Sequence, residues 1–440
     1  MKKVLILGAG LVARALVRYL LAQEGFEVKV ASRTLGKAQA LVGDAKNGSA
    51  EQLDVDNQVE LERLISEADL SISLLPYVYH PLVAKLCIKH KKAMVSASYV
   101  KEEMKALDAA AREAGIVLLN EIGVDPGIDH MSAMQVIDQI KTSGGKLVSF
   151  SSYCGGLPAP DANNNPFGYK FSWSPRGVIL AGKNPAQYLK EGKVVGVSGE
   201  DLFSHHWPVE IEGFGTLEGY PNRDSLPYIE TYGVHGVNNM FRGTLRYPGW
   251  CETMNKISEL GLLNEKERPD LAGLTFGEFT GRLVNSARDD LKDDLAAFLD
   301  VSPDSRVLSD LEWLGFLGDE PLPKAVHSPL DVLAERMLEK MRYGPGERDL
   351  LVMQHEFIAR YPDRTEKTTS TMIDYGIPHG DSSMCRLVGL PAAVAAKMIL
   401  RGEIDLVGVQ VPVVSEIYEP VLAELKQMGI SFNEKTEQVG

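Results

Sequence analysis

Six residues near the start of the chain, GAGLVA at positions 8–13, carry the clearest chemical signal. Their spacing is that of the GxGxxA turn of dinucleotide-binding folds. In that turn Gly8 permits a tight bend, Gly10 lets the backbone approach a pyrophosphate, and Ala13 allows close helix–strand packing. A helix that begins there would offer unpaired N–H groups to the phosphates. A glycine-rich structural turn is the alternative, but the order of strand, turn and amphipathic helix favours a dinucleotide site.

The end of the second expected strand indicates which nicotinamide nucleotide binds. NAD-binding proteins usually place Asp or Glu there to hydrogen-bond the ribose 2′-hydroxyl, and this carboxylate would repel a 2′-phosphate. Here the strand ends in Ser32-Arg33-Thr34, and arginine is the side chain that accommodates a phosphate. Arg33 could also be an ordinary surface arginine. Because the strand end has no carboxylate, we expect NADP(H).

Later strand ends bring further reactive groups to the same edge of the expected sheet, where ligands bind in open parallel sheets. Leu75, before Pro76, would form an apolar wall for the cofactor. Ser98 and Tyr99 bring hydroxyl groups, and Asp125 brings a carboxylate, to the edge where a nicotinamide would lie. Asp125 could equally be the N-cap of a helix that starts near residue 129.

Arginines recur in the middle of the chain, in Gly- or Pro-bounded segments rich in aromatic residues: Arg176, Arg223, Arg242 and Arg246. Guanidinium groups bind carboxylates through two parallel hydrogen bonds, so such a set could hold a polycarboxylate substrate. Each arginine taken alone could also be a surface residue or a structural ion pair. The formal net charge of −14 makes local arginines necessary for any anionic ligand, and it argues against nucleic acid or an anionic membrane as a partner.

The cysteines and histidines predict no metal site. Four cysteines lie far apart and without CxxC spacing, which also argues against a disulfide framework and fits a reducing cytoplasm: Cys87, Cys154, Cys251 and Cys385. We expect Cys154 to pack and the pair His205-His206 to be structural. Arg14 and Arg18 interrupt the first apolar stretch too early for a signal peptide, and we expect no membrane span.

The elements that must position these residues follow an alternating pattern over the first 126 residues. Short apolar runs predict strands at 4–7, 27–30, 70–74, 93–96 and 116–119. Apolar residues at three- and four-residue spacing predict helices at 12–21, 59–67, 81–90 and 101–114. Strands that alternate with helices indicate an α/β, Rossmann-type, doubly wound parallel sheet.

The pattern changes near residue 149, where Gly, Pro and Asn become frequent and segments such as 194–197, 209–211 and 242–247 resemble antiparallel strands. Residues 252–342 are charged, rich in leucine and poor in strand signals, which predicts a helical insertion. Near the C-terminus, a helix (390–401), a strand (407–413) and a helix (419–428) are expected to rejoin the first sheet.

Several long segments resemble the glutamate-forming saccharopine dehydrogenases, also called saccharopine reductases: residues 152–160, 168–177, 241–247 and 388–391, together with the N-terminal turn and 124–127. The resemblance implies a dinucleotide domain at 1–128 that is rejoined by about 388–440. It also implies an inserted α+β substrate domain at 129–387, with a helical subdomain at about 252–342. Members of this family are expected to be homodimers and to use NADP(H).

What the resemblance implies chemically is an enzyme of lysine biosynthesis or breakdown. It would interconvert saccharopine with L-glutamate and aminoadipate semialdehyde through an imine. The positions carried over as cofactor contacts are Gly8, Gly10, Leu11, Val12, Ala13, Arg33, Thr34, Asp54, Val55, Leu75, Ser98, Tyr99, Val124, Asp125, Pro126 and Ser174. Those carried over as substrate contacts are Ser98, Tyr99, Asp125, Arg223, Thr244, Leu245 and Arg246. Asp125 or Tyr99 would be the catalytic group that assists proton movement.

Two other readings stay open. A relative with another amine substrate, such as carboxynorspermidine dehydrogenase or homospermidine synthase, would share the scaffold but would not need arginines for three carboxylates. A non-catalytic NADPH-binding regulator would belong to a different class. The edge residues together with the arginines argue against this second reading.

Overall fold

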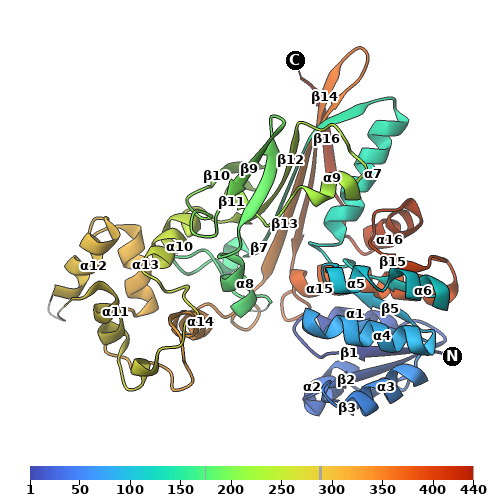
Figure 1. The fold of residues 1–440 in the computed structure, drawn as a ribbon, viewed down its shortest axis with the longest axis horizontal. Helices are drawn as coiled ribbons and strands as arrows, with labels where there is room; N and C mark the ends of the chain where they lie inside the picture. The colour runs from blue at the N-terminus through green and yellow to red at the C-terminus, as the bar shows by residue number, and fades with distance from the viewer. Residues whose placement is uncertain (174, 287–289, 440) are drawn as a thin grey trace. The chain divides into compact units, whose positions relative to one another are not determined.

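The computed structural model describes residues 1–173, 175–286 and 290–439. The chain forms two compact units, which are described separately (Figure 1). Unit 1 comprises residues 1–147, 361–363 and 376–433, and unit 2 comprises residues 148–360, 364–375 and 434–440.

Unit 1 is built on a seven-stranded sheet in the order β15-β6-β5-β4-β1-β2-β3. Its strands, all paired in parallel, are β1 (Lys2–Leu7), β2 (Phe26–Ser32), β3 (Gly48–Gln52), β4 (Leu70–Ser73), β5 (Ala93–Ser96), β6 (Val117–Leu119) and β15 (Gly408–Gln410). The strand order reverses at β1, which pairs with β2 on one side and β4 on the other. Ligands of such sheets bind outside the carboxyl ends of the strands at this switch point.

Helices follow most strands of unit 1: α1 (Ala13–Leu21), α2 (Leu35–Val42), α3 (Gln58–Glu67), α4 (His80–His90), α5 (Glu102–Lys105), α6 (Asp108–Ala114) and α7 (Ile128–Thr142). Side chains of β1 are buried on both faces of the sheet, and Leu5 and Leu7 pack in one apolar cluster with Leu61 of α3 and Val83 of α4. Burial on both faces explains why β1 is a continuous apolar run.

The C-terminal part of unit 1 completes the same layer. Strand β15 pairs with β6. In the chain, helix α15 (Ser383–Arg401) precedes this strand and helix α16 (Ser415–Gln427) follows it. Gly389 lets α15 lie close to α1, because a Cβ at that position would come within 2.9 Å of the Val12 carbonyl oxygen. By length and composition α15 could cross a membrane, but most of it is buried within unit 1, as in the core helix of a globular unit.

Unit 2 contains a nine-stranded sheet in the order β10-β11-β12-β7-β13-β14-β16, with β8 paired to β12 and β9 paired to β8. The strands are β7 (Lys146–Pro158), β8 (Ala186–Lys190), β9 (Lys193–Val197), β10 (Trp207–Ile211), β11 (Gly215–Pro221), β12 (Asn239–Arg246), β13 (Asp349–Arg360), β14 (Thr365–Tyr375) and β16 (Asn433–Gln438). Most neighbours are antiparallel, but β12 runs parallel to β7.

Helices gather in the middle of the unit 2 sequence: α8 (Pro175–Ala181), α9 (Pro227–Thr231), α10 (Trp250–Glu259), α11 (Phe276–Val284), α12 (Leu291–Leu299), α13 (Arg306–Leu314) and α14 (Pro329–Lys340) (Figure 1). One apolar core joins these helices to the sheet, since Trp250, Phe316 and Leu333 belong to the same buried cluster as Tyr153 and Leu245.

The structure confirms the α/β class, the parallel N-terminal sheet and the helical character of residues 252–342. Several details differ from the expectation. Helix α2 and strand β3 were not predicted, and the single helix expected at 101–114 is two helices, α5 and α6. Strand β12 was expected to be antiparallel and is parallel to β7 on one side. The expected domain boundaries at residues 128 and 388 stay predictions.

Candidate active site

The turn between β1 and α1 has the geometry that a phosphate-binding loop requires. Gly8 has φ +112°, and a Cβ there would lie 3.1 Å from the Leu74 carbonyl oxygen, so only glycine fits. A Cβ at Gly10 would meet no described atom within 4 Å, which leaves space beside the backbone. The first turn of α1 then begins at Ala13, which is fully buried, with the basic residue Arg14 next to it. This fits a bound pyrophosphate.

The end of β2 carries the residues expected to select the nucleotide. Arg33 and Thr34 are exposed, and within the described residues no ion pair involves the Arg33 side chain. The Arg33 backbone oxygen accepts a hydrogen bond from Gln52 Nε2 (3.2 Å), which fixes the loop to β3. An arginine in this state is available for a 2′-phosphate. Asp54 and Val55 follow β3, and Leu75 follows β4, at the same edge.

Tyr99 and Asp125 come from two neighbouring strand ends and meet at that edge. The Tyr99 hydroxyl donates to Asp125 Oδ1 over 3.1 Å, and Asp125 is half-buried. Helix α7 has Gly127 as its N-cap and no side-chain cap, and the Gly127 N–H donates to Asp129 Oδ1 (2.6 Å). The alternative reading of Asp125 as a helix cap is therefore wrong. Its carboxylate faces a phenol instead.

Ser98 is held by a buried histidine that sequence reasoning missed. His80 Nε2 lies 2.8 Å from Ser98 Oγ and 3.1 Å from Ser96 Oγ, and Nδ1 lies 3.0 Å from Ser73 Oγ. Burial lowers the pKa of His80 to about 4, so the imidazole is neutral near pH 7, with one nitrogen donating and the other accepting. The ring thus joins the ends of β4 and β5 and orients the Ser98 hydroxyl.

Arg246, the last residue of β12, is a buried cation of unit 2. Its side chain is buried, with 7% of the residue exposed, and the guanidinium lies over the rings of Tyr169 (4.8 Å) and Trp250 (5.5 Å). Nη1 donates to the Leu245 carbonyl oxygen over 2.7 Å. Nε has no hydrogen-bond partner, and no carboxylate lies within ion-pairing distance among the described residues.

The groups around Arg246 do not supply the missing negative charge. Glu218 stands opposite Arg246 in the β11–β12 ladder, but its carboxylate accepts the N–H groups of Gly249 (2.7 Å) and Cys251 (3.0 Å) where α10 begins. Burial raises the pKa of Tyr220 to about 12 and also raises the pKa of the Cys251 thiol, so both are neutral near pH 7. A buried cation without a carboxylate partner is costly, and a ligand carboxylate would offset that cost.

The other arginines differ in their surroundings. Arg223 is exposed in the loop after β11, at φ +57°, and its backbone oxygen accepts from the Gln187 N–H (3.0 Å). The Arg242 guanidinium lies 4.2 Å from the centre of the Tyr228 ring. Arg176 forms an ion pair with Asp331 (2.5 Å), which is the structural pairing that the sequence left open as an alternative.

Two family models match the chain, one over the N-terminal part and one over the rest. The family model of the saccharopine dehydrogenase NADP binding domain matches residues 4–119, and that of the saccharopine dehydrogenase C-terminal domain matches residues 123–430. The chain belongs to the saccharopine dehydrogenase family. It is 41% identical to the NADP⁺-linked, L-glutamate-forming saccharopine dehydrogenase of Schizosaccharomyces pombe, over 99% of each protein.

Two further members of this family are similar to the chain. The solved structure of the apo, histidine-tagged, L-Glu-forming saccharopine dehydrogenase of Saccharomyces cerevisiae superposes with a TM-score of 0.92 at 40% identity, covering 99% of this chain and 100% of the other. The mitochondrial alpha-aminoadipic semialdehyde synthase of Bos taurus is 43% identical over 98% of this chain, which spans 47% of that protein.

The structure brings together some of the residues expected from the saccharopine dehydrogenase family. Tyr99 contacts Asp125, and Thr244, Leu245 and Arg246 end one strand. Ser174 lies outside the described residues. The assignment of each position to cofactor or substrate stays a prediction.

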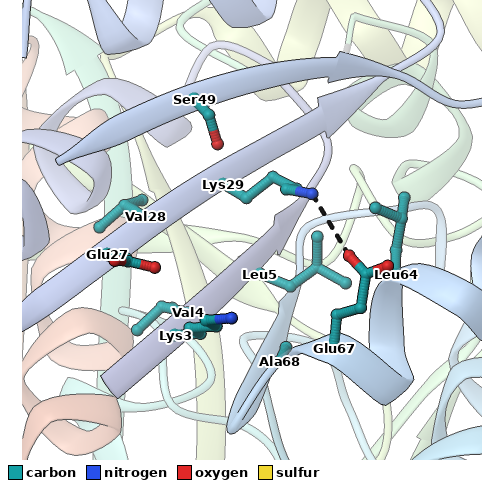
Figure 2. Close-up of a pocket in the computed structure, with 10 residues that line it drawn as sticks. All are labelled: Lys3, Val4, Leu5, Glu27, Val28, Lys29, Ser49, Leu64, Glu67 and Ala68. Carbon is teal, nitrogen blue, oxygen red and sulfur yellow. Dashed lines mark ion pairs between the residues drawn. The ribbon is translucent and has the colours of Figure 1, made fainter. Parts of the chain in front are cut away.

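A surface hollow in unit 1 lies away from this edge. Figure 2 shows that it is lined by residues from β1, β2 and β3 and from the end of α3, with Lys29 Nζ 3.5 Å from Glu67 Oε2. Its empty volume is about 510 Å³. The Gly8 turn follows the carboxyl end of β1, at the other edge of the sheet, so this hollow is not the dinucleotide site.

Proposed function

We propose that the chain is an NADP(H)-dependent oxidoreductase that interconverts saccharopine with L-glutamate and L-2-aminoadipate 6-semialdehyde. The observation that carries the choice of substrate is Arg246, a buried guanidinium that lacks a carboxylate partner among the described residues. Saccharopine has three carboxylates, whereas the polyamine substrates of related enzymes would not require this cation. The similarity over almost the full length to L-glutamate-forming enzymes supports the same substrate.

The cofactor half of the reaction rests on unit 1. The Gly8 turn and the start of α1 would hold the pyrophosphate, and Arg33 would hold the 2′-phosphate of NADP(H). When bound, the nicotinamide accepts or supplies the hydride. His80 keeps the Ser98 hydroxyl in one orientation at the strand edge. These residues act by placing the cofactor, and placement is a large part of catalysis in hydride transfer.

The substrate half requires anchoring and proton movement. Arg246 and Arg223 would each pair with a substrate carboxylate. Asp125 would pair with the primary ammonium group, and the Asp125–Tyr99 hydrogen bond offers a route for a proton near the bridging nitrogen. Oxidation of saccharopine removes a hydride from carbon and a proton from nitrogen, which gives an imine. Water then cleaves the imine to glutamate and the semialdehyde.

The decisive experiment is NADPH oxidation in the presence of aminoadipate semialdehyde. We expect turnover to require glutamate, since the hydride acceptor is the imine, and ammonia or a diamine should replace glutamate poorly. In reverse, saccharopine and NADP⁺ should release glutamate, and the equilibrium should shift toward oxidation as pH rises, because that direction releases a proton. Turnover with a diamine and none with glutamate would move the chain to the polyamine enzymes. NADPH binding without any turnover would support a regulator.

We also propose a cytoplasmic homodimer, with domains at 1–128 plus 388–440 and at 129–387. The resemblance to glutamate-forming saccharopine dehydrogenases supports the dimer, and the net charge of −14 argues against nucleic-acid and anionic membrane partners. Light scattering on the purified protein would measure the oligomeric state.

A further inference from the structure

Glu121 forms hydrogen bonds to the backbone on both sides of Tyr99. The Glu121 N–H donates to the Ser98 carbonyl oxygen (3.1 Å), and the Val100 N–H donates to Glu121 Oε1 (2.7 Å). One residue therefore fixes the peptide groups on both sides of Tyr99. Glu121 is 8% exposed, so water competes little for these hydrogen bonds.

The second oxygen of Glu121 extends this contact to α7. Glu121 Oε2 lies 2.8 Å from Nε2 of His130, which is fully buried. Nδ1 of His130 lies 3.9 Å from Asp129 Oδ1, and that same carboxylate oxygen accepts the Gly127 N–H (2.6 Å). The series Glu121–His130–Asp129 thus connects the segment of Tyr99 with the loop that carries Asp125.

Glu121 adopts an energetically unfavourable backbone conformation while it makes these contacts. Glu121 has φ +55°, a left-handed conformation that non-glycine residues rarely adopt. Such conformations persist when the surroundings determine them, and they gather at functional sites. Here the conformation turns the N–H toward Ser98 while the side chain returns to Val100. A buried carboxylate beside a buried imidazole is likewise costly unless both are well placed.

We propose that Glu121 is a positioning residue that acts through His130 to hold Tyr99 and Asp125 in hydrogen-bonding contact for the reaction. This inference rests on the proposed function, because the reaction supplies one of its readouts. Glu121 itself would touch neither substrate nor cofactor.

The kinetic test uses Glu121→Gln and its combination with Tyr99→Phe in the full-length protein. Misplacement of a reacting group by about 1 Å can cost on the order of 100-fold in rate. We expect Glu121→Gln to lower kcat for saccharopine oxidation roughly 10- to 100-fold, with the Kd of NADPH within about twofold of wild type, because the Gly8 turn is untouched. In a Tyr99→Phe background the same change should cost little, since the group that it positions is already lost.

A matched control is Glu62→Gln, which alters a Glu–His pair of similar length, Glu62–His90 at 2.9 Å, on the surface of unit 1. It should leave kcat and KM unchanged. Wild-type kcat in Glu121→Gln, or a full and additive loss in the Tyr99→Phe background, would overturn the proposal.

Hydrogen exchange gives a readout that does not need activity. In Glu121→Ala the Val100 amide loses its acceptor, so a peptide covering residues 97–101 should exchange at least about tenfold faster than in wild type or Glu62→Gln. If Glu121→Ala does not fold, His130→Gln should give the same non-additivity with Tyr99→Phe. If wild type is inactive but its Val100 amide is protected from exchange, the proposed function is contradicted. The positioning role of Glu121 is then still supported. Unprotected Val100 in an active wild type would contradict the positioning role alone.

Discussion

Replacing Arg246 by methionine separates substrate binding from stability, because saccharopine binding should weaken while the free energy of unfolding should change little. Methionine keeps much of the apolar stem and removes the guanidinium. A hydrogen bond to a charged group contributes about 1.5–3 kcal/mol, and a guanidinium can make two to one carboxylate. We therefore expect saccharopine binding to weaken by about 2 kcal/mol or more, which is roughly 30-fold in Kd.

Stability of the ligand-free protein should change little. The variant loses two ring contacts, at 4.8 Å to Tyr169 and 5.5 Å to Trp250, each contributing about 0.5–2 kcal/mol. It also removes a buried cation that has no carboxylate partner among the described residues, and this change is favourable by a similar amount. We expect the free energy of unfolding to stay within about 1 kcal/mol of wild type.

The assay is calorimetric titration with saccharopine in the presence of NADP⁺, paired with denaturant unfolding of the ligand-free protein. Arg176→Met, which breaks an exposed ion pair with Asp331, is the control for loss of an arginine. An unchanged Kd for saccharopine together with a loss of several kcal/mol of stability would refute the reasoning, since Arg246 would then be a structural residue.

Two further changes test unit 1. Arg33→Ala should lower the affinity for NADPH and leave the affinity for NADH unchanged, as measured by fluorescence titration; equal binding of both nucleotides by wild type would contradict this. The pKa of His80 is lowered to about 4 by burial, so the folded state binds fewer protons than the unfolded state between pH 4 and 6.5. The contribution of His80 to the free energy of unfolding is therefore fully present above pH 6.5. It falls by roughly 3 kcal/mol as pH falls toward 4. His80→Asn should flatten the pH dependence of the unfolding free energy in that window, and an unchanged slope would show that other groups cause it.

The sequence predicts the first sheet well because burial on both faces leaves an apolar signal in the β1, β4 and β5 strands. It fails for β3, whose residues Gly48–Gln52 are mostly polar and half-exposed. It also gives no strand for β7, because Gly155 and Pro158 weaken the strand signal there. Gly155 has a packing role instead, because a Cβ there would come within 2.6 Å of the Leu245 carbonyl oxygen.

The candidate site is predicted unevenly for a related reason. Residues at strand ends, such as Tyr99 and Asp125, stand where a parallel sheet places its ligands, and the resemblance names them. His80 stands at the start of α4 and carries no such signal, because its hydrogen bonds to serines exist only after the chain folds. Glu121 does follow a strand end, but its contacts with Val100 and His130 likewise form only on folding. Likewise, the sequence does not show that the Glu218 carboxylate binds the N–H of Gly249 at the start of α10. Glu218 therefore does not pair with Arg246, although the two residues are opposite each other in the β11–β12 ladder.

The pairing of β15 with β6 has a consequence for the order in which the protein acquires its structure during synthesis. The strands β1 to β6 leave the ribosome early, whereas β15 and the α15 helix that covers α1 are made after the whole of unit 2 up to Tyr375. Until then β6 presents an open edge and α1 an uncovered apolar face, both of which favour association with other chains. The nascent nucleotide-binding unit is therefore exposed to association with other chains for as long as translation of the middle segment takes.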